Sequence, residues 1–330
     1  MKSILKRRVF LVLFLGLVLS PIAAFGQGEP FPNRPINLYV GYAAGGSGAV
    51  TGQVLAEGLK KYLNQPIILN LKPGAAQAVA AEFMKNSKPD GYNLLYLSQA
   101  NWAAKVAKDK KEGAPIKVQI ADLDYLGAAP YSPTVGATSI DSPWKKFEDF
   151  IAAARKSPGV LNFCSDGIGT ANHLLGEYFS LKAGITMSHI PFQGGGPATT
   201  AVLGGHVQLI FNSLATLGAQ VKPGGGLRPL VIFDNKRTPI LAGVPTALEI
   251  GYDIVMSTSY YGLTAPKGLP KPVRDNLIQA FEKTVKDLQM IAMFTKVNAT
   301  LSYQTPEESG KRIQDEYNLF LDIWDKIGKK

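Results

Sequence analysis

The sequence has little cysteine and little histidine. One cysteine, Cys164, occurs in 330 residues, so an internal disulfide is excluded. The three histidines are far apart and no acidic cluster has the spacing of an EF-hand loop, so we expect no metal ion and no cofactor. A chain of this length buries one or two hydrophobic cores without covalent cross-links.

Long apolar runs and basic clusters are also missing after the first 26 residues. No later stretch reaches about 18 uninterrupted apolar residues, the length that a membrane-spanning helix needs. Lysines occur in short mixed-charge segments such as KDKKEG at residues 108–113, and no basic stripe alternates with aromatic residues. We therefore expect a soluble chain with solvated lysines and without a nucleic-acid partner.

Residues 1–26 have the features of a secretory signal peptide. Four basic residues between Lys2 and Arg8 precede the apolar run Val9–Val18, and the small-residue site Ala24–Gly26 follows. No cysteine follows this site, which argues against a lipid anchor, and a bacterial periplasm is the expected location. Without the four leader charges, 31 basic residues stand against 25 acidic ones, and a net charge of +6 favours anionic partners.

Strand-like runs alternate with helix-like segments along the chain. INLYVGY at residues 36–42 precedes a helical pattern at about 50–62, and PIILNL at residues 66–71 precedes another at about 76–84. Such alternation predicts α/β layers with mostly parallel strands. Near the C-terminus, Thr305 followed by Pro306 and two acids predicts the start of a helix that ends near residue 328.

One strand–loop–helix unit occurs twice. The first, INLYVGYAAGGSGAVT, has no charged residue between Ile36 and Gln53, and LNFCSDGIGTANHLLGEYFSL at residues 161–181 repeats its pattern. The first N–H groups of a helix lack internal partners and the helix dipole is positive there, so a helix N-terminus binds a carboxylate without Arg or Lys. Two such units predict two lobes that each present a helix N-terminus to a ligand; ordinary tight turns are the alternative interpretation.

The small residues of the two loops are the first site candidates. Glycine permits close backbone approach and positive φ angles, and hydroxyl groups add donors. The glycines are Gly45, Gly46, Gly48, Gly167 and Gly169, and the hydroxyl residues are Ser47, Ser165 and Thr170.

Enzyme sites are the competing interpretation of the first loop. GGSGA at residues 45–49 nearly matches the nucleophile elbow G-x-S-x-G, which makes an exported serine hydrolase using Ser47 an alternative. Ala49 replaces the last glycine of that motif, and a histidine must still converge on the serine. As a dinucleotide fingerprint the same loop is broken, because Thr51 stands where the third glycine belongs.

An ordered series of segments resembles the substrate-binding proteins of the tripartite tricarboxylate transporter family, also called the Bug family. The segments span almost the whole chain after the leader: FPNRPINLYVGYAAGG, LNQPIILNLKPGAA, KPDGYNLLYL, SDGIGTANHLLGEYF, HIPFQGGGPATTAVLGGHVQLIF, GVPTALEIGY and YYGLTAPKGLPKPV. The resemblance implies a non-catalytic, monomeric periplasmic protein of the type 2 binding-protein fold. Such a protein closes two lobes over a small organic anion, often a carboxylate, and delivers it to membrane permease subunits. A ligand sensor for a membrane kinase is a further alternative.

The resemblance also implies a division of the chain and a ligand site. Residues 31–130 and 255–330 are expected to form lobe 1 and residues 131–254 lobe 2, with crossings near 128–135 and 255–262. The ligand is expected to bind largely to backbone N–H groups of residues 42–49 and 165–170. The residues expected at the site are Tyr42, Ala44, Gly45, Gly46, Ser47, Gly48, Ala49, Ser98, Tyr131, Ser165, Gly167, Gly169, Thr170, His173, Phe192 and Asn212.

The sequence departs from the family pattern near the expected ligand. Ala49 stands where the family usually has an aspartate, and Phe192 and Gln193 stand where it usually has tyrosine and lysine. We interpret the neutral first loop as suited to a ligand that brings its own negative charge. An aromatic or more apolar acid would fit beside the aromatic residues Tyr42, Trp102, Tyr131 and Phe192.

Overall fold

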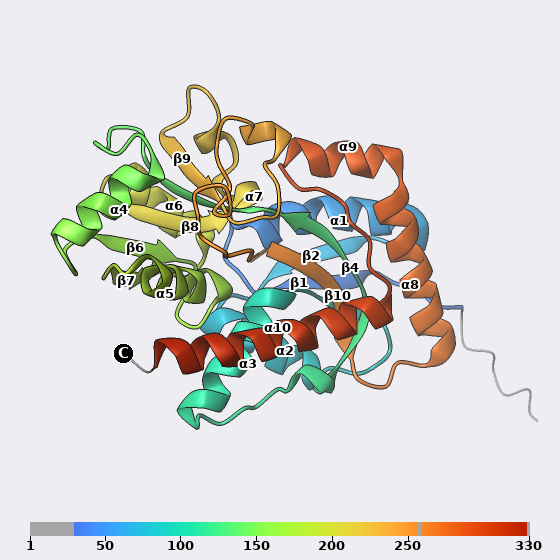
Figure 1. Ribbon diagram of the computed structural model, residues 1–330. Coiled ribbons are helices and arrows are strands. Elements are labelled where there is room, and N and C mark those ends of the chain that lie inside the picture. The colour runs from blue at the N-terminus through green and yellow to red at the C-terminus, as the bar shows by residue number, and fades with distance from the viewer. Residues whose placement is uncertain (1–29, 257–258, 329–330) are drawn as a thin grey trace, which may run out of the picture.

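The computed structural model describes residues 30–256 and 259–328. Two five-stranded sheets lie side by side, and helices cover the faces of each (Figure 1). We call each sheet with its helices a lobe. The expected signal peptide, residues 1–26, lies outside the described residues. Within the described ranges, no helix combines the length and apolarity that a bilayer crossing requires.

The first sheet has the strand order β2-β1-β3-β10-β4. The strands β1, β2 and β3 are parallel, and β10 is antiparallel to its neighbours β3 and β4. The sheet is therefore mixed, with one antiparallel strand. Its strands are β1 (Ile36–Val40), β2 (Ile67–Leu71), β3 (Asn93–Ser98), β4 (Leu123–Ser132) and β10 (Ser259–Pro266).

The second sheet has the strand order β7-β6-β8-β5-β9, in which β6, β7 and β8 are parallel and β5 is antiparallel to β8 and β9. The two sheets thus have the same order and the same single reversed strand, and β1 occupies the position in one sheet that β6 occupies in the other. The unit that recurs in the sequence therefore recurs in the fold. The strands are β5 (Thr134–Ser139), β6 (Asn162–Ser165), β7 (Ser188–Pro191), β8 (Leu209–Ser213) and β9 (Leu227–Ile232).

Most strands lead directly into a helix. The helices are α1 (Ser47–Leu63), α2 (Ala78–Lys85), α3 (Gln99–Glu112), α4 (Phe147–Lys156), α5 (Ala171–Ala183), α6 (Gly195–Leu203), α7 (Leu214–Leu217), α8 (Lys271–Lys286), α9 (Leu288–Lys296) and α10 (Pro306–Ile327).

The predicted start of the last helix is confirmed. Glu308 N–H donates to Thr305 Oγ1 at 3.2 Å and Thr305 N–H donates to Glu308 Oε2 at 2.8 Å, a capping box.

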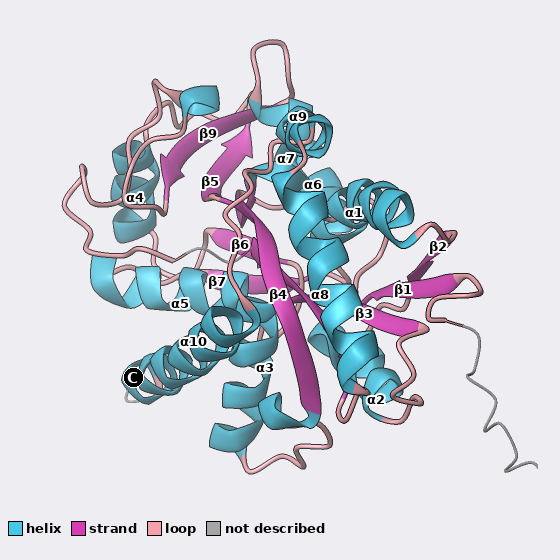
Figure 2. Cartoon of the chain, turned by 90° about the vertical axis from the view of Figure 1, so that its right-hand side faces the viewer, coloured by secondary structure: helices cyan, strands magenta, loops and turns pink. Residues whose placement is uncertain are grey.

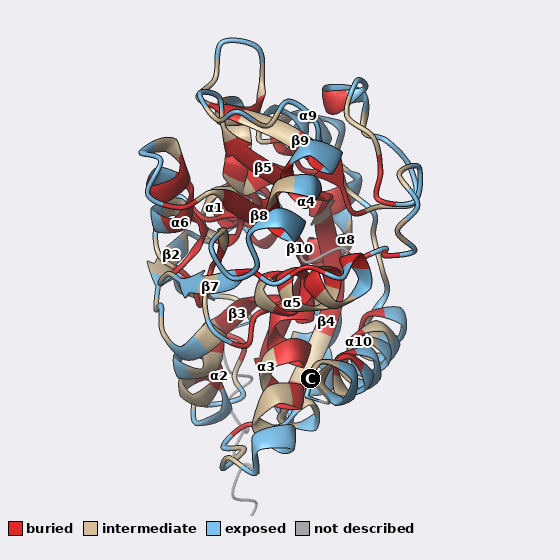
Figure 3. Ribbon diagram, turned by 60° about the vertical axis from the view of Figure 1, so that its left-hand side comes forward, coloured by how far each residue is buried: buried red, intermediate tan, exposed pale blue. Residues whose placement is uncertain are grey.

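Both faces of the inner strands β3, β8 and β10 are buried, which explains their largely apolar sequences, whereas the edge strands β2 and β7 are partly exposed. In β3, Leu94 and Tyr96 face a core shared with α1 and α8, whereas Leu95 and Leu97 face a second core. This second core continues into the other lobe through α3, α5 and α10, and Figure 3 shows the buried residues gathered along the strands of both sheets. Cys164 is buried at the end of β6, as expected for a small core residue.

The chain passes from the first sheet to the second over a single residue. Pro133 separates the last residue of β4 from the first residue of β5 (Figure 2). The return passage ends at the first residue of β10 and includes residues 257 and 258, which lie outside the described residues. The division of the chain at residues 131 and 255 stays a prediction, and the sheet membership of β4, β5 and β10 is consistent with it.

Candidate functional site

A cavity of about 260 Å³ lies where four loops meet. The loops follow β1 and β2 in one lobe and β6 and β7 in the other, at topologically equivalent places. Ligands of open α/β sheets bind at the carboxyl ends of parallel strands, and all four loops leave such ends. The lining residues are Gly41, Tyr42, Pro73, Gly74, Ala75, Ala76, Asp166, Gly167, Ile168, Pro191, Phe192 and Gln193.

Each of the four loops runs within a few residues into a helix: α1, α2, α5 or α6. Four helix N-termini therefore belong to the loops around the cavity, where the sequence predicted two. Their dipoles favour negative charge, so the surroundings suit an anion although no basic residue is among the described lining residues.

The first loop joins the two lobes. Ser47 N–H at the start of α1 donates to Thr216 Oγ1 of the other lobe at 2.9 Å, so one N–H group expected to meet the ligand is already partnered. Gly45 has φ +81°, and a Cβ there would lie 3.5 Å from the Cα of Gly196. The expectation of positive φ is wrong for Gly46, whose φ is −78°, and for Gly48, which is not among the glycines with positive φ. Glycine is required at position 48 for a different reason, because a Cβ there would lie 2.9 Å from the Tyr261 ring.

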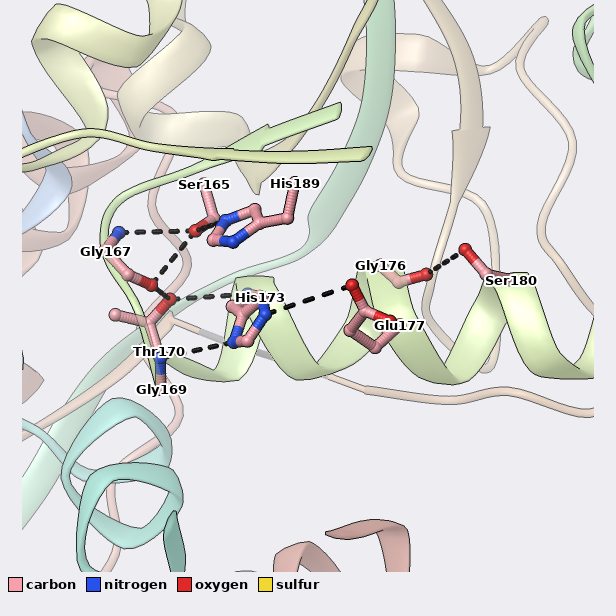
Figure 4. A network of polar contacts seen from close by, with 9 residues as sticks. All are labelled: Ser165, Gly167, Gly169, Thr170, His173, Gly176, Glu177, Ser180 and His189. Carbon is pink, nitrogen blue, oxygen red and sulfur yellow. Dashed lines mark hydrogen bonds and ion pairs between the residues drawn. The ribbon is translucent and has the colours of Figure 1, made fainter. Parts of the chain in front are cut away.

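The second loop is held by its own side chains (Figure 4). Ser165 Oγ lies 2.8 Å from His189 Nε2 and donates to Gly167 O at 3.0 Å, while Gly169 N–H donates to His173 Nδ1 at 3.2 Å. Thr170 caps α5 by accepting from the N–H of His173. These side chains shape the loop, and of the predicted residues in it only Gly167 lines the cavity.

His173 and His189 stack with ring centroids 4.0 Å apart. Burial, together with the neighbouring His189 and Lys108, lowers the pKa of His173 to about 3, and burial lowers the pKa of His189 to about 4. Both rings are therefore neutral at neutral pH. Because Nδ1 of neutral His173 accepts a hydrogen bond, its proton is on Nε2, 4.0 Å from Glu177 Oε1.

Asp166 is the main site residue that the sequence analysis missed. It lines the cavity, is 8% exposed, and burial raises the pKa of its carboxyl. The first loop is neutral, as noted for Ala49, but an acid from the second loop lies in the same cavity. The neutrality noted for the first loop therefore does not extend to the cavity as a whole. The position of this acid between strand and helix, in SDGIGT, was the available signal.

The loop after β2 was missed as well. Ala75, Ala76 and Gln77 have φ angles of +46°, +50° and +77°, three left-handed residues in succession without a glycine among them. Gln77 is fully buried and its side chain bonds both the N–H and the C=O of Ser98. This contact fixes the loop against β3 and leaves the two alanines on the cavity wall.

The predicted aromatic residues separate into different environments. Tyr42 and Phe192 line the cavity. Trp102 is buried in the core of α3, and Tyr131 lines a different groove of about 1,100 Å³ beside α10. The structure therefore does not bring Tyr131 to the other candidates. The predicted Ser98 and Asn212 are buried near the ends of the equivalent strands β3 and β8, and neither is among the described lining residues.

The Ser47 hydroxyl has no histidine partner among the described residues. Its Oγ lies 2.9 Å from Tyr261 Oη and 3.2 Å from Ser259 Oγ. A serine nucleophile requires a base within hydrogen-bond reach, and this geometry offers none. The described residues also contain no group of three or more His, Cys, Asp or Glu side chains arranged to hold a metal ion.

Comparison with known proteins agrees with this architecture. A protein of Cupriavidus necator, "UPF0065 protein in gbd 5'region", is 38% identical over 282 residues, covering 82% of this chain and 80% of its own. Protein BugT of Bordetella pertussis is 28% identical over 98% of both chains. A solved "periplasmic transporter" is 30% identical with a TM-score of 0.85, covering 90% of this chain and 98% of its own.

Two further solved structures share the fold and hold ligands. MatC from Rhodopseudomonas palustris, with bound malate, is 23% identical with a TM-score of 0.81 and covers 89% of this chain and 99% of its own. An R. palustris protein with adipate is 20% identical with a TM-score of 0.83 and covers 90% of this chain and 98% of its own.

The model of the Tripartite tricarboxylate transporter family receptor, TctC, matches residues 51–329. That family consists of substrate-binding receptors, and the order of segments in the sequence, the paired sheets and the cavity between equivalent loops all fit it. The chain belongs to the tripartite tricarboxylate transporter receptor family, whose members include the Bug proteins.

Proposed function

We propose that the chain is a periplasmic solute-binding protein that captures a small organic carboxylate between its lobes and delivers it to a membrane permease. The observation that carries the proposal is the cavity at the carboxyl ends of β1, β2, β6 and β7, each followed by a helix N-terminus. A ligand there touches both lobes at once, so its binding favours the closed form. The chain acts without catalysis and as a monomer.

The ligand is a small acid. A volume of about 260 Å³ lies just below the range of about 300–1,000 Å³ typical of sites for drug-sized molecules. The related folds that hold malate and adipate support a carboxylate of this size. Contact with the permease is transient, and export to the periplasm depends on residues 1–26.

The test is a ligand screen on the mature protein. Thermal unfolding is measured with mono-, di- and tricarboxylates, including aromatic ones, and hits are titrated by calorimetry. A ligand bound only by the folded form adds about 2.7 kcal/mol of stability at about one hundred times its dissociation constant. Amines and sugars of similar size serve as negative controls. Stabilisation by those compounds and by no carboxylate would overturn the proposal.

A further inference from the structure

The groove of about 1,100 Å³ beside α10 is separate from the cavity. It lies against β4, β10 and the segment after β9, and none of its described lining residues lines the cavity. In the strand orders, β4 and β9 form the sheet edges opposite to β2 and β7. One wall is α10 and the other is residues 234–239, and Pro133 at the crossing between the sheets also lines the groove. The groove therefore touches both lobes.

On the α10 wall, the Glu316 carboxyl has acceptor capacity that no donor uses. Arg312 Nε and Nη2 lie 3.0 Å and 2.9 Å from Oε1, whereas Oε2 is buried and has no hydrogen-bond partner among the described residues. Gln304 Oε1, on the same groove, is also buried and unpartnered. Buried polar groups nearly always have partners, so both oxygens lack a donor. The Glu316 side chain keeps 14% of its surface exposed, and its broad terminal torsion allows Oε2 to turn to a ligand.

The opposite wall presents a second carboxyl, that of Asp234. Its Oδ1 accepts from the N–H of Asn235 at 2.7 Å, and a carboxylate has about four acceptor positions. Burial raises the pKa of Asp234 above its usual range, and burial raises the pKa of Glu316 to about 7 in spite of Arg312. Both carboxylates have lost hydration in the folded chain, so a cationic donor in the groove would stabilise their ionised forms.

Most cations along the groove are already paired with carboxylates. The Arg312 guanidinium also lies over the Tyr260 ring, 4.0 Å from its centre. Among the described contacts, Asp234 and Glu308 have no ion pair, and Lys236 is the one lining cation without one. The balance in the groove therefore favours a positive ligand. The pairs are Arg312 with Glu316, Lys311 with Asp315, and Arg237 with Glu249.

We propose that this groove is a second binding site, which takes a small aliphatic diamine with one ammonium group at Glu316 and the other at Asp234. The methylene stem lies on the apolar part of the lining. This inference is independent of the proposed carboxylate ligand, because it uses other residues. The apolar lining residues are Val255, Met256, Leu301, Leu319 and Phe320.

A diamine in this groove links the two lobes. Glu316 belongs to α10, which packs on β4 of the first sheet, whereas Asp234 follows β9 of the second sheet. A ligand that touches both carboxylates in the arrangement described here favours that arrangement over one in which the lobes have moved apart. The groove is thus a place where an organic cation can influence the relative position of the lobes without entering the cavity.

The test is calorimetry with amines that differ in charge and length. The probes are 1,3-diaminopropane, 1,5-diaminopentane and 1,8-diaminooctane, each with the monoamine of the same chain length and with 1,5-pentanediol as the uncharged control. Measurements at pH 8 keep Glu316 ionised and the amines protonated. The diamine that spans the groove best should bind tenfold or more tightly than its monoamine, because its two ends are linked. Equal affinity of diamine and monoamine at every length, or no binding of any diamine, overturns the proposal.

Two variants locate the site. Glu316→Gln and Asp234→Asn should each lower the affinity of the tightest diamine about tenfold, to the level of its monoamine, with an unchanged far-ultraviolet circular dichroism spectrum. Glu57→Gln and Asp141→Asn make the same charge changes at exposed positions outside the groove and should keep the full affinity. If Glu316→Gln does not fold, Asp234→Asn decides the matter alone. Full diamine affinity in the groove variants overturns the assignment.

Discussion

Glycine at position 169 illustrates how a single backbone angle shapes the second loop. Its φ is +77°, a left-handed conformation that costs a residue with a Cβ about 1–2 kcal/mol of conformational free energy. A Cβ would also lie 2.5 Å from Lys108 Cδ, so that flexible side chain would have to move. We expect Gly169→Ala to lower the free energy of unfolding by about 1–2 kcal/mol, measured by urea denaturation.

The matched control at this scale is Gly310→Ala in α10. A Cβ at Gly310 meets nothing within 4 Å, and alanine in a helix interior is more stable than glycine by about 0.5–1 kcal/mol. The same chemical change should therefore have opposite signs at the two positions. Equal effects would show that the angle at Gly169 does not matter.

We expect the stacked histidines His173 and His189 to make the folded protein less stable in acid. Their pKa values of about 3 and 4 in the folded chain lie below the value of about 6.5 for an unperturbed histidine. The unfolded chain therefore binds more protons between about pH 4 and 6.5, and stability falls as the pH falls through that window. The double variant His173→Gln and His189→Gln should lose less stability than the wild type between pH 7 and 5.

Melting temperatures of both proteins at each pH give this comparison. Asp166 and Glu316, whose pKa values are raised by burial, have the opposite effect on stability, because the folded chain holds their protons more tightly. They are present in both proteins and cancel in the difference. Parallel pH profiles would contradict a role for the histidine pair.

At the scale of elements, α10 links the lobes. It packs on α3, β4 and α5, with Ile313, Phe320 and Ile323 buried, and its first turn depends on the capping box at Thr305. We expect Thr305→Ala to cost about 1 kcal/mol of unfolding free energy, and Thr305→Ser to change it little because serine keeps the capping oxygen. Chemical denaturation measures both. Equal losses in the two variants would mean that the methyl group, and not the cap, stabilises the helix end.

At the scale of the whole molecule, direct bonds between the lobes hold the cavity closed. Ser47 N–H donates to Thr216 Oγ1 at 2.9 Å, and Asn101 Oδ1 accepts from the N–H of Ala171 at 2.8 Å. Thr216→Val removes one acceptor and keeps the shape. We expect a larger radius of gyration without ligand, measured by small-angle X-ray scattering. Ligand affinity should be about fivefold weaker, because one hydrogen bond contributes about 1 kcal/mol.

The comparison variant is Thr200→Val. Thr200 is exposed on α6 and its hydroxyl donates only to Gly196 O within its own helix, among the described contacts. It should leave both the radius of gyration and the affinity unchanged. An unchanged radius of gyration in Thr216→Val would show that the bond between Ser47 and Thr216 does not hold the lobes together.

The sequence by itself determined the features that depend on neighbours along the chain. The alternation of strands and helices follows from hydrophobic periodicity. The start of α10 follows from its cap residues, and the equivalence of β1 and β6 was visible as a repeated strand–loop–helix unit. These signals are local, because a period of two or 3.6 residues and a capping residue act within one or two turns.

Only the tertiary structure decided which loops meet. The strand order places the loops after β2 and β7 beside those after β1 and β6. That order is set by packing between residues far apart in sequence, which no local pattern records. For this reason Asp166 enters the cavity although it reads as an ordinary turn residue, and Tyr131, predicted at the site, lies on another groove. The chemistry of the cavity therefore became visible only when both sheets were assembled.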